Sequence, residues 1–523
     1  MENNEFLPKA ATTPQPPPYY ASYIPRNKKP EYHEFKSRVA SSKGLIISIL
    51  SIVLCILFLE TILFQSPGVA APIYLAAFYC SIYYFFRENN GRFNKAAVFL
   101  TIPAMLMAVS FFIHYNPSTR WITWLTLIGI ICIQLILLGS FQIGSIFSLD
   151  TLVKVISNLF AKPFTNLQMP FHSFGILKDK KSATTKNILY ALIGIIVALP
   201  IAAILMGLFV QADAVFAASV KSFKNFIGLD FDRITIELIL GLPSGIFLGA
   251  ALLGLKFEKH KEKTVKNVGS CIESVITGTF LTIINIFLIA FVGFQFMYLF
   301  GGTDNIKTSG IGYAEYARRG FFELCTASAL IFAIAFFVIV MTKKKNEKLS
   351  IWVSLGTLVL CAGDGVLLIS AVKRMFMYIS AYGLSIKRVL TLWLMAIIGL
   401  CLLWMIIKCF KIGLDVTKWI GMTVIIGVCI LSLTNIEKLI AKYNVNSYLE
   451  NPDEPSVVFY LNQLSFTAAP QLEKLQGLPD HQKIEINFNG LVENKRIQLS
   501  ARNKLYGFTL DSLEASKVLN KTN

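Results

Sequence analysis

Eleven apolar runs divide this chain, and they constrain its fold more than any other feature of the sequence. Each run is close to the roughly 20 residues that an α-helix needs to cross the hydrocarbon core of a bilayer. Because 54% of the residues are hydrophobic, the composition excludes an ordinary soluble protein. The sequence therefore predicts an all-α fold, a polytopic transmembrane helical bundle with about 11 spans. The runs cover residues 44–64, 68–86, 96–113, 121–142, 187–210, 233–255, 272–298, 320–341, 349–372, 388–408 and 417–433.

The distribution of lysine and arginine predicts the orientation. With the N-terminus in the cytoplasm, the inner segments carry 28 basic residues and the outer loops carry 11. Because cytoplasmic loops are enriched in basic residues, we expect a multi-pass protein of the cytoplasmic (plasma) membrane, with its N-terminus inside and its C-terminus outside. The predicted parts are a disordered, proline-rich, basic cytoplasmic tail at 1–43, the helical bundle at 44–435, and an extracytoplasmic, mainly helical tail at 436–523.

The chain offers little that is typical of a catalytic or metal site. Its nine cysteines lie in or beside the apolar runs without the spacing of metal ligands, and its five histidines do not cluster with them. The sequence contains no nucleophile–base pair and no phosphate-binding glycine loop. The net charge of +18 comes mainly from short loops between apolar runs, which is typical of membrane proteins. We therefore expect no enzyme activity, catalytic residue, cofactor, metal or nucleic acid.

Two adjacent runs carry residues that interrupt or pack helices. Gly241, Gly245 and Gly249 recur at four-residue spacing in the sixth run, and small residues at this spacing let another helix approach closely. Pro243 lies among them and removes a backbone donor, so we expect a kink. Pro200 interrupts the fifth run near its middle. Such residues serve either as packing devices of a helical bundle or as the mark of a transport site.

Charged residues near the eighth and ninth runs form a candidate polar cluster. Glu315, Arg319 and Glu323 recur every four residues, so they share one face of a helix, and Arg318 can reach Glu315. Asp364 lies inside the ninth run, about 12 Å from its outer end. A charge at that depth is costly and should face the bundle interior, and an unpaired carboxyl there is expected to be protonated. Either Glu323 and Asp364 line an outward-opening polar pocket with Arg319 at its mouth, or the arginines bind lipid phosphates.

Amphipathic segments lie outside the apolar runs. In 149–160 and in 215–227, apolar residues follow helical spacing with lysines off that face. These loops lie in the plane of the membrane interface or pack on the bundle as loop helices. Beyond the last run, 457–475 predicts an amphipathic helix and 483–497 a short strand or helix. We expect this C-terminal tail to rest on the outer face of the bundle.

Several blocks of the sequence resemble a bacterial membrane family that is catalogued only as a domain of unknown function, the four-one-seven-three and four-one-five-three group. The resemblance covers roughly residues 140–475, whereas the final forty-odd residues show none. One block departs from the family pattern, because it lacks the proline expected after Asp213. The resemblance implies a helical membrane bundle and no established activity. The blocks are YAEYARRGFFEL (313–324), QADAVF (211–216), RMFMYISAYGLSIKR (374–388), NIEKLIAKYN (435–444) and YLNQLSFTAAPQL (460–472).

Two classes of function fit these features. The polar tails at both ends suit partners, so we favour a membrane scaffold or a sensory or regulatory component of the cell envelope. Its expected partners are the lipid bilayer and other membrane or envelope proteins. The alternative is a secondary transporter for a small solute or ion that uses an outward-facing polar cavity near Asp364. A continuous aqueous cavity at this residue would distinguish the transporter from a closed bundle.

Overall fold

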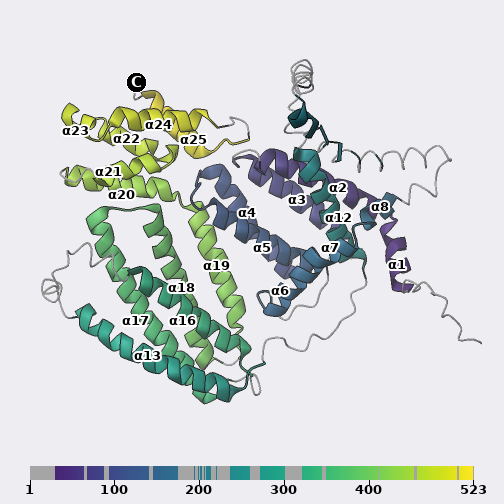
Figure 1. The fold of residues 1–523 in the computed structure, drawn as a ribbon, viewed down its shortest axis with the longest axis horizontal. Coiled ribbons are helices and arrows are strands. Elements are labelled where there is room, and N and C mark those ends of the chain that lie inside the picture. The colour runs from purple at the N-terminus through teal and green to yellow at the C-terminus, as the bar shows by residue number, and fades with distance from the viewer. Residues whose placement is uncertain are drawn as a thin grey trace, which may run out of the picture.

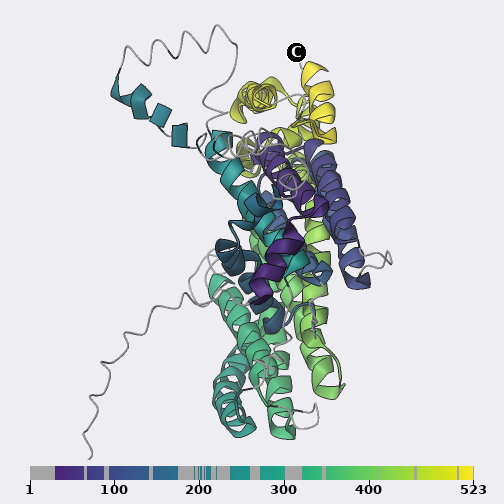
Figure 2. The same cartoon turned by 90° about the vertical axis from the view of Figure 1, so that its right-hand side faces the viewer.

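The computed structural model describes residues 30–63, 67–87, 94–139, 145–174, 236–258, 271–300, 321–343, 349–411, 413–452, 456–502 and 506–521, with short stretches between 194 and 220. Within these ranges every named element is a helix, and one isolated β-bridge pairs Ile272 with Thr342. The predicted all-α polytopic bundle is therefore confirmed. Figure 1 shows two helix groups side by side with a smaller helical domain at the upper left, above one of them, and Figure 2 shows the same domain at one end of the molecule.

The first helix group is built from the N-terminal third of the chain together with α12. These helices share one hydrophobic core, to which long apolar side chains from each span contribute. Its elements are α1 (Pro30–Val39), α2 (Ser42–Phe58), η1 (Leu59–Leu63), α3 (Ala70–Phe86), α4 (Lys95–Ile113), α5 (Arg120–Leu138), α6 (Leu149–Val155), η2 (Ile156–Ala161), α7 (Lys162–Thr165), α8 (Met169–Ser173), η4 (Glu237–Gly241) and α12 (Leu242–Phe257).

The second helix group consists of α13 (Ser274–Phe300), α16 (Phe321–Met341), α17 (Ile351–Tyr382) and α18 (Ile386–Phe410). Between the two groups lies α19 (Val416–Leu433), which is green in Figure 1 and contributes side chains to both cores. Val416 and Leu431 belong to the core of the second group, whereas Val428 and Cys429 belong to that of the first. The helix α19 therefore joins the two groups.

The number of candidate spans is lower than predicted. The described residues contain nine helices that are long and apolar enough to cross a membrane, rather than 11. The second predicted run forms α3, a shorter apolar helix of 17 residues, because Pro67 and Gly68 precede its start. The fifth run lies mostly outside the described residues, so Pro200 does too. The ninth run continues as helix to Tyr382, so the first part of the predicted outer loop 373–388 is helical.

The helix α12 packs closely against α2 along its glycine face. A Cβ atom added to Gly245 would lie 2.5 Å from the Cα atom of Ile52, which is closer than side-chain atoms approach a backbone. Gly249 lies against Ser51 and Gly241 against Leu59. Next to them, Pro243 occupies the first turn of α12, directly after the π-helical turn η4. Because proline has no N–H group to continue the α-helical pattern, the change of helix type occurs there.

Two segments differ in part from the sequence-based description. The tail predicted to be disordered at 1–43 contains α1, whose Phe35 and Val39 are buried against the first group, while residues 1–29 lie outside the described residues. The predicted amphipathic segment 149–160 forms α6 and η2. Its apolar side chains Leu152 and Phe160 are about half exposed, which favours the interfacial alternative over packing on the bundle. The second such segment, 215–227, lies almost entirely outside the described residues.

The C-terminal region forms a helical domain that packs on the ends of α17, α18 and α19 (Figure 1). The amphipathic helix predicted at 457–475 is broken into short pieces, and 483–497 is helical rather than a strand. The core of this domain is continuous with that of the second group. Its elements are α20 (Ile436–Glu450), α21 (Ser456–Phe459), η5 (Tyr460–Gln463), η6 (Phe466–Ala468), α22 (Ala469–Leu475), α23 (Asp480–Glu485), α24 (Phe488–Ser500) and α25 (Leu510–Lys521).

Candidate functional site

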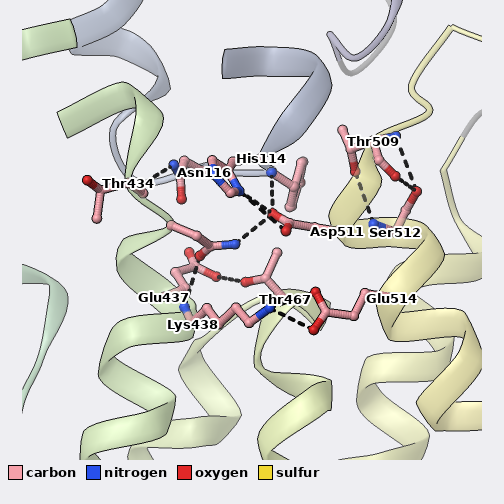
Figure 3. Close-up of polar contacts among 12 residues, drawn as sticks. His114, Asn116, Thr434, Glu437, Lys438, Thr467, Thr509, Asp511, Ser512 and Glu514 are labelled. Atoms are coloured by element: carbon pink, nitrogen blue, oxygen red, sulfur yellow. Dashed lines mark hydrogen bonds and ion pairs between the residues drawn. The ribbon is translucent and has the colours of Figure 1, made fainter. Parts of the chain in front are cut away.

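Polar side chains join the C-terminal domain to the turn between α4 and α5, residues 114–119. Figure 3 shows these contacts, which bring together segments that are more than 300 residues apart in the sequence. We call the five central residues the clamp: Tyr115, Ser118, Asn435, Glu437 and Asp511. The local sequence explains the positions of two of these residues. Asn435 is the N-cap of α20, where its side-chain oxygen accepts a hydrogen bond from Lys438 N at 2.9 Å, and Asp511 lies in the first turn of α25.

Asp511 is the principal acceptor of the clamp. Its carboxylate is 7% exposed and accepts hydrogen bonds from Asn435 Nδ2 at 2.6 Å and from Tyr115 N at 3.0 Å. His114 Nδ1 lies 3.3 Å from the same carboxylate (Figure 3). A buried carboxylate needs such partners, because its desolvation would otherwise be costly. The contact therefore ties α25 both to the α4–α5 turn and to the start of α20.

Glu437 is the second buried carboxylate of the clamp, at 2% exposure. It accepts hydrogen bonds from Ser465 N at 2.6 Å and from Thr467 Oγ1 at 3.3 Å, both within the C-terminal domain. It also accepts from Ser118 Oγ at 3.0 Å, across to the α4–α5 turn. Lys495 is buried nearby, and its Nζ donates to Leu464 O at 2.5 Å. Burial lowers the pKa of Lys495 to about 8, although Glu437 favours the charged form.

An aromatic and cationic stack extends the clamp. The rings of Tyr115 and Phe466 are stacked with their centroids 4.9 Å apart, and the Arg502 guanidinium lies 4.1 Å from the Tyr115 centroid. Burial lowers the pKa of Arg502 to about 10, which leaves the side chain charged at neutral pH. A desolvated cation over an aromatic ring contributes about 2 kcal/mol. The stack thus adds a second, less directional attachment of the domain to the α4–α5 turn.

Other contacts attach the same domain to further turns between spans. Val69 N, at the start of α3, donates to Phe508 O at 3.0 Å. In the second group, the turn between α17 and α18 is held by Asn444, whose side chain accepts from Leu384 N at 2.8 Å and donates to Leu384 O at 3.0 Å. Ile386 N donates to the Tyr460 hydroxyl at 3.0 Å. The C-terminal domain therefore contacts connections that belong to both helix groups.

The two carboxylates of the clamp each accept several hydrogen bonds from other parts of the chain. In the part of the chain that the structure describes, no group of three or more histidine, cysteine or acidic side chains is placed to hold a metal ion. Together with the contacts of Asn444 and Tyr460, the clamp can hold the two helix groups and the C-terminal domain in a defined relative position.

The polar cluster predicted from the sequence is only partly described. Glu315, Arg318 and Arg319 lie outside the described residues. Glu323 is exposed near the start of α16, whereas Asp364 is completely buried in α17. No hydrogen bond among the described residues reaches either carboxylate oxygen of Asp364.

Asp364 has polar neighbours within the bundle. The Ser328 hydroxyl of α16 lies near its carboxyl, but among the described residues neither group has a hydrogen-bond partner. Thr357 lies seven residues before Asp364 on the buried side of α17, and the part of the chain that the structure describes offers its hydroxyl no hydrogen-bond partner either. These three side chains form a polar strip inside the second helix group, at a depth where unpaired polar groups are costly.

Sequence reasoning missed the clamp. Asp511 lies in the tail without a family resemblance, and nothing in its local pattern indicates a partner almost 400 residues away. Glu437 does stand in the block NIEKLIAKYN, which the resemblance had included, but its role depends on the turn at Ser118. A usable signal was the asparagine at 435, because an N-cap directly after an apolar run predicts a sharp change of helix direction.

Comparison with known proteins gives one finding. The family model described as Domain of unknown function (DUF4153) matches residues 101–475, which is more than half of the chain. This match confirms the resemblance stated from the sequence, and it begins earlier, at the middle of α4. No curated protein and no solved structure matches the chain.

Proposed function

We propose that this chain, which belongs to the family of Domain of unknown function (DUF4153), is a sensory or regulatory scaffold of the cell envelope. The observation that carries the proposal is the attachment of one C-terminal domain to turns of both helix groups through buried polar contacts. In this proposal the protein lies in the cytoplasmic membrane with its N-terminus inside. The C-terminal domain then lies outside and binds an envelope partner, and no reaction is assigned to the chain.

The contacts support coupling between the domain and the spans. A rigid domain that holds the α2–α3, α4–α5 and α17–α18 connections can move the helices on either side only together. A partner that binds one arrangement of the domain more tightly would shift the equilibrium between the helix arrangements, by an amount set by the difference in its binding free energy for the two arrangements. The buried carboxylates favour one docked position, because any other position leaves donors and acceptors without partners.

Hydrogen–deuterium exchange on the full-length protein in nanodiscs tests the coupling. Asp511→Asn weakens the clamp at the C-terminal domain. We expect faster exchange at the far end of the first group, in the peptides that cover α6 and η2, as well as beside the substitution. The matched control is Glu514→Gln on the same helix, where the pair with Lys438 is exposed. Faster exchange confined to the neighbours of Asp511 would mean that the domain is a passive cap, which contradicts a sensory role.

Secondary transport is the second candidate, and Asp364 is the observation that favours it. A carboxyl buried at membrane depth beside two hydroxyls, with no hydrogen-bond partner for any of the three among the described residues, is typical of proton or cation pathways. Proteoliposomes loaded with a pH-sensitive dye test this function. Ion or proton flux that is present in the wild type and absent in Asp364→Asn would support a transport function in place of the proposed scaffold function. Asp480→Asn, in the exposed helix α23, is the control for a change of charge alone.

A further inference from the structure

A partly enclosed apolar cavity lies inside the first helix group, away from the clamp. Its volume is about 270 Å³, and its walls come from α2, η1, α3, α4, α5, η2 and α12. A dry apolar cavity of about 150 Å³ is already large enough to bind benzene. The present cavity therefore has room for a longer apolar group. Its larger lining side chains include Phe58, Tyr74, Phe78, Trp124, Leu135 and Phe160.

The cavity is elongated and lies at membrane depth. On α5 its lining extends from Trp124 to Leu135, which corresponds to about 16 Å along the helix axis. This length is close to half of a hydrocarbon core of about 30 Å, and thus to one leaflet. Four of the walls, α2, α4, α5 and α12, belong to helices that qualify as membrane spans. The surroundings of the cavity are therefore lipid tails rather than water.

The chemistry of the lining disfavours water. Almost all of the lining side chains are aliphatic or aromatic. The Tyr74 hydroxyl already donates to Leu54 O at 3.2 Å. An ordered water molecule needs two to four polar partners, which this lining does not supply. An empty cavity, in turn, loses the van der Waals contacts that hold helices together in a bilayer.

The cavity opens beside surfaces that face the lipid. Ile128 on α5 and Phe160 on η2 both line it, and each is 50% exposed. In the segment α6–η2, Leu152, Val153 and Ile156 are about half exposed, as in an interfacial helix, whereas Val155 and Leu159 are buried. A phospholipid whose headgroup stays at the interface near η2 can therefore direct one tail inward between α5 and α12.

We infer that one acyl chain of a membrane phospholipid occupies this cavity as a bound, structural ligand. Lipid tails are as apolar as leucine, so the acyl chain gains no hydrophobic free energy by moving from the bilayer into the cavity. Its binding is favoured instead by the fit of its shape and by van der Waals contacts with the lining. The side chain of Ala251 is buried and lines the cavity from α12, so a larger residue there would take the place of the tail. This inference concerns the first group alone and does not depend on the proposed function.

Native mass spectrometry of the full-length protein, washed in detergent and supplied with dioleoylphosphatidylglycerol, tests the inference. We expect one retained phospholipid per wild-type chain and at least about tenfold lower occupancy in Ala251→Phe. Val275→Phe adds the same ring on the exposed side of α13 and should retain the lipid as the wild type does. A wild type without retained phospholipid, or equal retention by both variants, would overturn the inference.

Photocrosslinking keeps the inference testable if Ala251→Phe does not fold. The photoreactive residue p-benzoylphenylalanine replaces Phe78, which is buried and lines the cavity. In detergent-washed protein we expect its main product to carry the mass of one phospholipid. Products that join Phe78 only to other parts of the chain, such as the run 187–210, would show that protein fills the cavity instead.

Discussion

Removal of the Asp511 carboxylate should detach the C-terminal domain from the first helix group. Asp511→Ala eliminates an acceptor that serves Asn435 Nδ2 at 2.6 Å, Tyr115 N at 3.0 Å and His114 Nδ1 at 3.3 Å. Each hydrogen bond to a charged group contributes about 1.5–3 kcal/mol, and the donors left behind are partly or fully buried. Because contacts that share one acceptor are not additive, we expect a total cost of about 3–5 kcal/mol for detachment.

The amide of Val69 reports this detachment without touching the substituted residue. It donates to Phe508 O at 3.0 Å, so it exchanges with solvent only when the domain separates from the start of α3. A cost of about 3–5 kcal/mol corresponds to a loss of protection of roughly two to four orders of magnitude. Exchange in the peptide that covers residues 67–71 should be measured on the full-length protein in nanodiscs.

Glu514→Gln provides the matched control on the same helix. Glu514 pairs with Lys438 at 2.6 Å, but its side chain is 47% exposed, so the loss should be only about 0.2–1 kcal/mol. Protection of Val69 should then fall by less than about tenfold. Equal protection of Val69 in Asp511→Ala and Glu514→Gln would show that the buried carboxylate does not hold the domain, and the reasoning from burial would be refuted.

Three further predictions concern topology, packing and pH. Reporter fusions after Lys348 and after Asn435 should report the cytoplasm and the exterior respectively, because three spans separate them; the same side for both would contradict this arrangement of spans, and reversed sides would contradict the orientation. Gly245→Ala should lower the free energy of unfolding in detergent by about 1–3 kcal/mol, because the added Cβ atom would lie 2.5 Å from a backbone atom of α2. Gly129→Ala, where the added Cβ atom has open space around it, should leave this free energy unchanged. The pKa of Lys495 is about 8 in the folded protein and 10.5 for an unperturbed lysine side chain, so below pH 8 both the folded and the unfolded state carry the proton. Between pH 8 and 10.5 only the folded state releases the proton. As the pH rises through this range, the free energy of unfolding of the wild type should therefore increase relative to that of Lys495→Met, by at most on the order of 3 kcal/mol. A difference that does not depend on pH would argue against burial of the charge.

The apolar runs by themselves determined where most membrane helices lie. The helices α4, α5, α18 and α19 begin and end within a few residues of the predicted runs. This agreement has a local cause, because a helix in lipid satisfies its own backbone hydrogen bonds and needs only a long enough apolar segment. Where a boundary depends on a competing local signal, as at Pro67 before α3, the length of the run overestimates the span.

Only the tertiary structure decided how the spans are joined and which charges matter. Depth in the bilayer marked Asp364 as unusual from the sequence, but the burial of Ser328 and Thr357 beside it depends on how α16 packs against α17. Asp511 looks like an ordinary acidic residue in the first turn of a polar helix. Its importance arises because folding places it against Tyr115 N, and a hydrogen bond between residues 396 positions apart leaves no periodic trace in the sequence. Local pattern thus determines the helices, whereas the free energy that holds the C-terminal domain on them comes from contacts that exist only after packing.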